Sequence, residues 1–168
     1  TPLLHDALQN VTGPALLTMG RLLAYLGDPA GAAPLLAALD DALQGESLPD
    51  LAERSVHIRP DHGWAPQPCY WIACLARLGD RRLLPRQERL AERLDPDPSR
   101  ADAAFSYVHA ITWALERLAL PEAIPLLQRL AAHPALADHT LPPDQDVRLS
   151  ADQVRERWAY LELCVGRA

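Results

Sequence analysis

One short sequence pattern occurs three times in the chain, each time between two segments whose apolar residues have helical spacing. The copies are AYLGDPAGAAPLLAAL at 24–39, ARLGDRRLLPRQERL at 76–90 and ERLALPEAIPLLQRL at 116–130. A proline follows each turn, at Pro34, Pro85 and Pro125. Counted from Leu26 to Leu78 the repeat is 52 residues long, and from Leu78 to Leu118 it is 40. Paired helices repeating at this spacing predict an array in which each hairpin buries its apolar stripe against the next.

The clearest hairpin runs from 103 to 132. Apolar residues recur in its first half at three- and four-residue steps, which places them on one helical face. They are Ala104, Tyr107, Val108, Ile111, Ala114, Leu115 and Leu118, and after the turn Ile124, Leu127, Leu130 and Ala131. Pro121 fits a first helical position, where its missing N–H costs nothing, so the turn is expected at 118–120.

Local start and stop signals place the other helices. A short leading helix is expected over 2–9, and a capping box introduces a final helix over 150–168. The expected N-caps of the helices between are Thr12, Asp28 and Asp80. The expected helix ends are Gly27 and Gly79.

Composition favours an all-α fold in one domain. The chain has 168 residues, of which 49% are hydrophobic and 5% aromatic, so little or no sheet is expected. The net charge of −6 gives no electrostatic footprint for nucleic acid. No apolar run approaches the ~18 residues of a membrane span. We therefore expect neither nucleic acid nor a membrane as a partner.

The cysteines indicate the cellular compartment, and the chain ends indicate whether the chain is part of a longer one. Cys69, Cys74 and Cys164 give no disulfide framework, which predicts a reducing, cytoplasmic compartment. The chain begins at Thr1 without Met and stops at Ala168 inside an apolar helical pattern. We expect a single domain over 1–168 that is a fragment of a longer chain, with apolar surface to be covered at its open end. The sequence leaves the oligomeric state open.

The LGDP turn at 26–29, the LGD turn at 78–80 and the trailing prolines resemble HEAT repeats, particularly the short PBS-lyase HEAT-like type. The resemblance covers 14–168, as three hairpins and the leading helix of a fourth. The third turn departs from it by reading LALP, and the long inserts are atypical. The resemblance implies a right-handed α-α superhelix of about seven helices that docks partners, and it carries no catalytic residues over.

Two long inserts, 45–68 and 134–149, each follow the second helix of a hairpin. They should therefore emerge from the same edge of the array, which is the predicted interaction face because insertions collect where repeat proteins bind. The first insert holds the richest cluster of polar and aromatic side chains in the chain. Its members, with those just after it, are His57, Asp61, His62, Trp64, Cys69, Tyr70, Trp71 and Cys74.

Three interpretations of this cluster compete. A zinc site from His57, His62 and Cys69 would use borderline and soft ligands, but no paired CxxC supports it. A small-molecule or peptide pocket would use Trp64 and Tyr70 as contact surfaces. The interpretation we favour has surface histidines in a loop and Trp71 in the core, as ordinary burial tendencies predict. We therefore expect no bound metal and no cofactor.

A row of arginines follows the second turn. Arg82, Arg86, Arg89 and Arg93 share one helical face by spacing, opposite the leucines. The row could meet an acidic partner or a phosphate through bidentate contacts. A solvated face, with Glu88 and Glu92 nearby, is the more ordinary interpretation.

No nucleophile elbow, metalloprotease helix or phosphate loop is present in the sequence. The leading hypothesis is therefore a non-catalytic helical-repeat scaffold that binds a protein partner or the remainder of a larger polypeptide. The alternative is an accessory C-terminal domain of an enzyme, to whose site the 45–68 loop contributes His57 or His62. A stand-alone metalloprotein is a third possibility.

Overall fold

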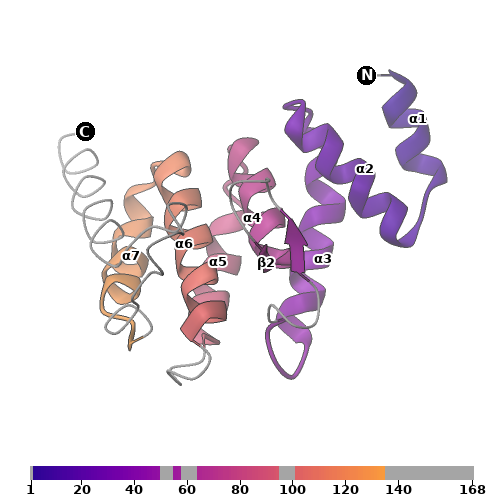
Figure 1. Ribbon diagram of the computed structural model, residues 1–168. Helices are drawn as coiled ribbons and strands as arrows, with labels where there is room; N and C mark the ends of the chain where they lie inside the picture. The colour runs from indigo at the N-terminus through magenta and orange to yellow at the C-terminus, as the bar shows by residue number, and fades with distance from the viewer. Residues whose placement is uncertain (1, 50–54, 58–63, 95–100, 135–168) are drawn as a thin grey trace.

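The computed structural model describes residues 2–49, 55–57, 64–94 and 101–134, which are mostly helical (Figure 1). The α-helices are α1 (Pro2–Asn10), α2 (Gly13–Tyr25), α3 (Ala32–Gln44), α4 (Gln67–Arg77), α5 (Leu83–Glu92), α6 (Ala101–Leu118) and α7 (Ile124–Ala131). Short 3₁₀ helices, η1 (Pro29–Gly31) and η3 (Pro121–Ala123), precede α3 and α7. The all-α prediction is confirmed for these residues. The helix expected over 150–168 lies outside them.

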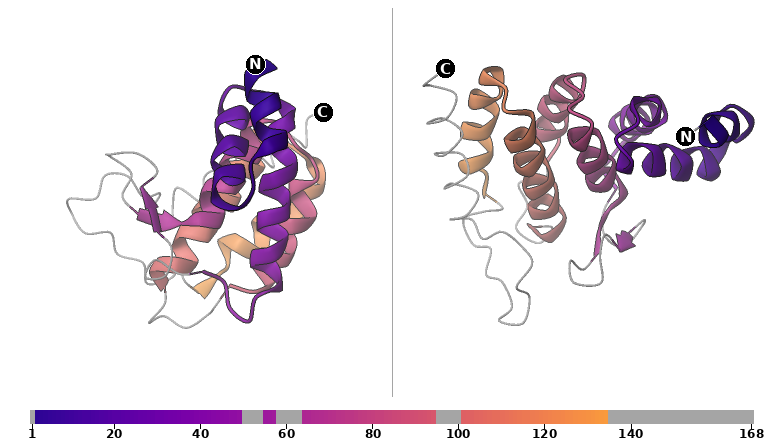
Figure 2. Two further views of the ribbon diagram at one scale, coloured as in Figure 1. Left: turned by 90° about the vertical axis from the view of Figure 1, so that its right-hand side faces the viewer. Right: turned by 90° about the horizontal axis from the view of Figure 1, so that it is seen from above.

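After α1 the helices form three hairpins, α2–α3, α4–α5 and α6–α7. Figures 1 and 2 show that the hairpins follow one another from one end of the described chain to the other. Corresponding helices of neighbouring hairpins are in contact: α2 with α4, α4 with α6, α3 with α5 and α5 with α7. Sequence order is therefore also spatial order.

The three repeated turns share a residue in the left-handed region of backbone conformation. The residue after the recurring leucine (Leu26, Leu78 and Leu118) has a positive φ in each: 80° at Gly27, 69° at Gly79 and 47° at Ala119. In the first turn the amide of Gly27 donates to Ala24 O at 3.0 Å, and the amide of Asp28 donates to Leu23 O at 2.9 Å. This pair of bonds is a Schellman motif, which ends the helix by satisfying its last carbonyls.

The second turn repeats the same bonds, from Gly79 to Ala76 O at 3.0 Å and from Asp80 to Leu75 O at 3.2 Å. In the third turn the amide of Ala119 donates to Leu115 O at 2.9 Å. Alanine therefore occupies the left-handed position that the other two turns give to glycine. The third turn, LALP, therefore keeps the left-handed residue but closes with the single bond of an αL motif instead of the Schellman pair.

Two of the three predicted N-caps form a side-chain bond. Asp28 Oδ1 accepts from the amide of Ala30 at 3.0 Å, and Asp80 Oδ1 accepts from the amide of Arg82 at 3.0 Å. Thr12 occupies the N-cap position of α2 with an extended backbone, but its side chain makes no capping bond. The recurring prolines lie in the first turns of α3, α5 and α7, where a missing N–H is tolerated.

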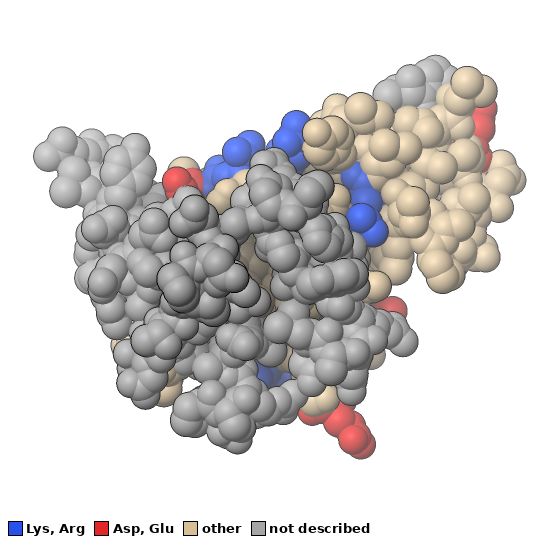
Figure 3. Space-filling model, in the orientation of Figure 1, with Lys and Arg blue, Asp and Glu red and all other residues tan. Residues whose placement is uncertain are grey.

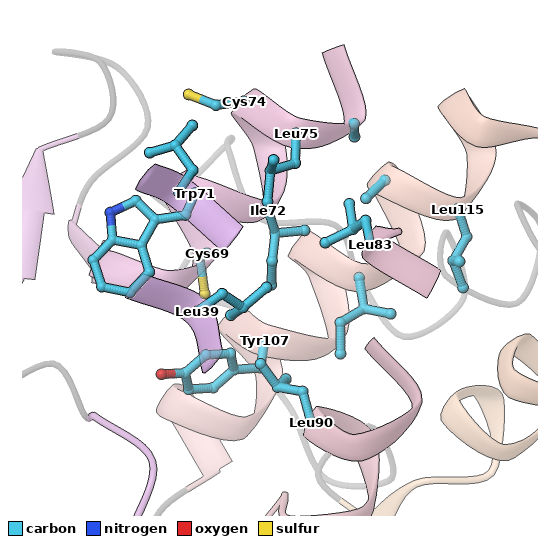
Figure 4. Close-up of a cluster of buried hydrophobic side chains, with 14 of the residues drawn as sticks. Leu39, Cys69, Trp71, Ile72, Cys74, Leu75, Leu83, Leu90, Tyr107 and Leu115 are labelled. Atoms are coloured by element: carbon cyan, nitrogen blue, oxygen red, sulfur yellow. The ribbon is translucent and has the colours of Figure 1, made fainter. Parts of the chain in front are cut away.

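The core lies between the hairpins. Figure 4 shows side chains from α4 and α5 meeting those from α3 and α6, with Ile72 and Leu83 close to its centre. The predicted stripe residues Tyr107, Val108, Ile111, Ala114, Leu115, Leu127 and Leu130 are buried. Leu35, Leu36, Leu39, Leu43, Leu75 and Leu90 of the first two hairpins are buried as well. Leu118, Ile124 and Ala131 are only half-buried, while the unpredicted Leu126 is buried.

Helix α2 and the start of α3 approach each other through two glycines. A Cβ built on Gly31 would lie 2.4 Å from Gly20 O and 2.7 Å from the amide nitrogen of Ala24. A Cβ on Gly20 would lie 2.7 Å from Cγ of Pro34. The first hairpin therefore closes at a backbone-to-backbone distance that no side chain permits.

The first insert contains a two-stranded antiparallel ribbon that the sequence did not predict. Strand β1 (Ser55–His57) pairs with β2 (Trp64–Pro66), so that Ser55 lies opposite Pro66 and His57 opposite Trp64. The ribbon contacts α4, and β2 also contacts α6. Tyr107 of α6 donates its hydroxyl to Pro49 O at 2.7 Å and so holds the start of the insert. The second insert, 134–149, lies outside the described residues beyond Pro134.

Candidate interaction surface

The predicted arginine row on α5 faces α3 for part of its length. Arg86 Nη2 lies 2.6 Å from Asp40 Oδ2, and Arg89 Nη1 lies 4.0 Å from Asp40 Oδ1. Arg86 also donates to the carbonyl of Arg82 at 2.8 Å. The middle of the row is thus engaged by a carboxylate of the preceding hairpin. Its use by an outside acidic partner stays a prediction.

The last arginine of the row binds the carboxyl end of α3. Arg93 donates through Nη1 to Leu43 O and through Nη2 to Gly45 O at 2.5 Å. These carbonyls belong to the end of a helix that has no basic residue in its own last turn. A guanidinium there satisfies orphan carbonyls and complements the negative end of the helix dipole. Arg93 therefore joins two hairpins.

The first arginine of the row, Arg82, pairs with a carboxylate two residues before it in the sequence. Arg82 forms a two-atom contact with Asp80, with Nε–Oδ1 at 3.0 Å and Nη2–Oδ2 at 2.7 Å. Hydrogen bonds from Arg82 hold the pKa of the Asp80 carboxyl below its usual value. Asp80 is thereby kept ionised for its capping role.

The cluster around the ribbon is described only in part. Asp61 and His62 lie outside the described residues, and of His57 and Trp64 only the backbone pairing is described. Tyr70 follows the ribbon on α4 and packs under Arg21 of α2, whose guanidinium carbon lies 4.2 Å from the ring centroid. The predicted contact role of Tyr70 for a ligand stays untested.

The cysteines beside this cluster belong to the core. Cys69, Trp71 and Cys74 are 3%, 8% and 7% exposed, so the prediction that Trp71 is a core residue is confirmed. The Cys69 thiol points toward Leu39 and Tyr107, while that of Cys74 points away from the cluster (Figure 4). Burial raises the pKa of the Cys74 thiol to about 11 and that of Cys69 further. Both thiols are therefore protonated at neutral pH.

Metal ligands do not gather in the part of the chain with described side chains. No three His, Cys, Asp or Glu residues there are placed to hold an ion together. The zinc hypothesis also involves His57 and His62, whose side chains are outside that part.

A second surface runs along the three turns. Tyr25, Arg77 and Arg117 each stand one residue before the turn leucine, so they occupy equivalent positions at the ends of α2, α4 and α6. The guanidinium of Arg77 lies 4.7 Å from the ring centroid of Tyr25. Arg81 Nη2 lies 3.5 Å from Glu122 Oε1, which joins the second turn to the third.

We call this surface the turn edge; its residues are Tyr25, Leu26, Arg77, Arg81, Arg117 and Glu122. All six are exposed. Figure 1 places the three turns on the upper side of the molecule, and Figure 3 shows arginine atoms along that side in the same orientation. Sequence reasoning missed the turn edge because it treated each turn as a helix end. The equivalent positions of Tyr25, Arg77 and Arg117 were the signal available.

Comparison with known proteins finds no matching family model, no similar curated protein and no similar solved structure. Within the described helices, none combines the length and the hydropathy needed to cross a bilayer.

Proposed function

We propose that the chain is a non-catalytic repeat module, a right-handed superhelix of HEAT-like hairpins that binds another protein or docks onto the rest of a larger polypeptide. The support is structural repetition. The three hairpins share a left-handed turn residue, a proline in the first turn of the second helix and one order of packing. Arrays built this way use their continuous outer faces for binding.

One observation carries the proposal: polar and aromatic side chains link corresponding helices of successive hairpins. Arg21 and Arg77 stack on Tyr70 and Tyr25, so α2 and α4 each give the other an arginine and a tyrosine. Helices α3 and α5 are joined by the Arg86–Asp40 ion pair.

The third hairpin continues this pattern. Arg129 Nη1 of α7 lies 3.9 Å from Glu92 Oε1 of α5, again between second helices. A module that stacks by such contacts can extend beyond three units without a new kind of interface. Its function then resides in an outer surface that spans several hairpins.

The experiment is affinity capture with built-in competition. The tagged chain is incubated with extract from the source cells, and captured proteins are then challenged with excess untagged chain, either folded or heat-unfolded. The proposal predicts at least one protein that folded chain displaces and unfolded chain does not. If no protein behaves this way, the chain is not a free-standing binding module under these conditions and the proposal fails.

A further inference from the structure

We propose that the turn edge is the docking surface for an acidic segment of a protein partner. The inference rests on the proposed repeat function, and it names the face and the chemistry of the partner. It differs from the sequence-based prediction, which placed binding on the α5 arginines and the inserts.

Charge supports an acidic partner. The chain as a whole carries a net charge of −6, yet the turn edge presents Arg77, Arg81 and Arg117 against the single carboxylate of Glu122. Two ionised aspartates lie nearby, but each is already paired, Asp28 with His5 and Asp80 with Arg82, at 2.7 Å. The side chains of Asp28 and Asp80 are 13% and 12% exposed and are bound to the amides that they cap. A positive surface attracts the negatively charged segments of a partner.

The arginines of the turn edge are also held in place. Arg77 lies over Tyr25, and the guanidinium carbon of Arg117 lies 5.4 Å from the ring centroid of Trp113. A guanidinium stacked by its face keeps its N–H groups directed outward, in the geometry that carboxylates accept bidentately. Among the described carboxylates, none pairs with Arg77 or Arg117. Each ring contact therefore reduces the conformational freedom that its arginine would lose when a partner binds.

Apolar surface adjoins the arginines. Tyr25 is 60% exposed and Leu26 55% exposed, both at the end of α2. An acidic segment that also carries apolar side chains would pair with the arginines and cover these two residues. This combination favours a protein segment over a bare polyanion, which would leave the apolar part uncovered.

The test uses peptides as probes. A phage-displayed library of short random peptides is selected on the whole chain and counter-selected on the Arg77→Ala/Arg117→Ala variant. Enriched peptides should be rich in Asp and Glu with at least one large apolar residue. Their dissociation constants should rise at least about tenfold on the variant. They should change less than about twofold on the matched variant Arg89→Ala/Arg129→Ala.

Fluorescein-labelled single-stranded DNA and vesicles of phosphatidylserine and phosphatidylcholine are measured alongside. Enrichment of uncharged peptides, no enrichment, equal binding to both variants, or tighter binding of DNA or vesicles through the same arginines would each overturn the inference. If the double variant loses its helical circular dichroism, Arg77→Gln and Arg117→Gln are measured singly. Partners captured equally by wild type and by turn-edge variants would leave the repeat function standing and remove this inference alone.

Discussion

Asp40 on α3 and Arg86 on α5 form an ion pair with a 2.6 Å contact between residues 46 positions apart in sequence. Their side chains are 31% and 23% exposed, so the pair is partly shielded from water. The pair ties together the second helices of two consecutive hairpins. It is the kind of long-range contact on which a stacked array depends.

A double-mutant cycle on this pair should show real coupling. Asp40→Asn and Arg86→Gln, measured singly and together by urea unfolding, should give a coupling free energy of about 0.5–1 kcal/mol. The matched control is Arg81 with Glu122, whose side chains are 69% and 62% exposed and 3.5 Å apart. Its coupling should be close to zero because water screens it. Equal coupling free energies in the two cycles would mean that the Asp40–Arg86 pair stabilises the packing of α3 on α5 no more than an exposed ion pair would.

The three turns allow a clean test of backbone conformation. A Cβ on Gly79 would meet no atom within 4 Å, so only its φ of 69° opposes a side chain. Gly79→Ala should therefore lower the free energy of unfolding by about 1 kcal/mol. Ala119→Gly should raise it by about 0.5 kcal/mol, because relief of the strained φ exceeds the entropy lost by glycine. Thermal unfolding of the two variants gives the answer, and changes of the same sign would refute the equivalence of the turns.

The contact between Gly20 and Gly31 predicts a much larger effect of one methyl group. Gly31→Ala would force a Cβ to within 2.4 Å of a backbone oxygen, so α2 and α3 must separate. We expect a loss of about 2–3 kcal/mol in the free energy of unfolding. Gly45→Ala is the control, because its nearest contact is an ordinary 3.4 Å. Denaturant titration should separate these variants, and comparable stability would show that the hairpin closes less tightly.

The buried Gln87 is a polar side chain in an apolar position. It stands two residues after Pro85, where the other hairpins have the buried Leu36 and Leu127. Its Nε2 makes a long 3.4 Å bond to Ile111 O and its Oε1 has no partner in the described structure. Gln87→Met should therefore raise the free energy of unfolding by about 1 kcal/mol. Destabilisation measured by urea unfolding would indicate that Gln87 has a polar partner.

His133 predicts a pH dependence. Burial lowers its pKa from 6.5, and a hydrogen bond with the Leu94 backbone opposes this only in part. The unfolded chain therefore takes up the proton more readily than the folded chain. The stability that His133 confers is complete above about pH 6.5 and falls as the pH drops toward the lowered pKa. His133→Gln should lose less stability than wild type between about pH 7 and pH 5. Parallel pH profiles from chemical denaturation would contradict this.

The helices and turns could be predicted because their signals are local. Asp28 and Asp80 were expected caps, and each accepts the amide two residues on, just before α3 and α5 begin. Gly27 and Gly79 were expected helix ends, and each takes the left-handed position after its helix. The ribbon at 55–66 was missed because strands of three residues leave no detectable alternation.

The candidate surface was less accessible to sequence reasoning because it depends on which helices become neighbours. Spacing correctly placed Arg86 and Arg93 on one face of α5. It could not show that Asp40 and the end of α3 lie against them. Gln87 was missed for the same reason, since a polar residue among arginines gives no sign of burial. The stack of Arg77 on Tyr25 joins two helices that are adjacent in space only.

Distances between exposed sites on the second helices of the three hairpins test the stacked arrangement most directly. Spin labels are placed in pairs at Ala37, Arg89 and Gln128, on α3, α5 and α7, in a Cys164→Ser background, and the buried Cys69 and Cys74 are left unchanged. Pulsed electron–electron double resonance measures the distances between the labels. The distance between labels at 37 and 128 should be clearly longer than the 37–89 and 89–128 distances. A 37–128 distance equal to or shorter than the other two would mean that the hairpins close into a globule, and the repeat-array account would be wrong.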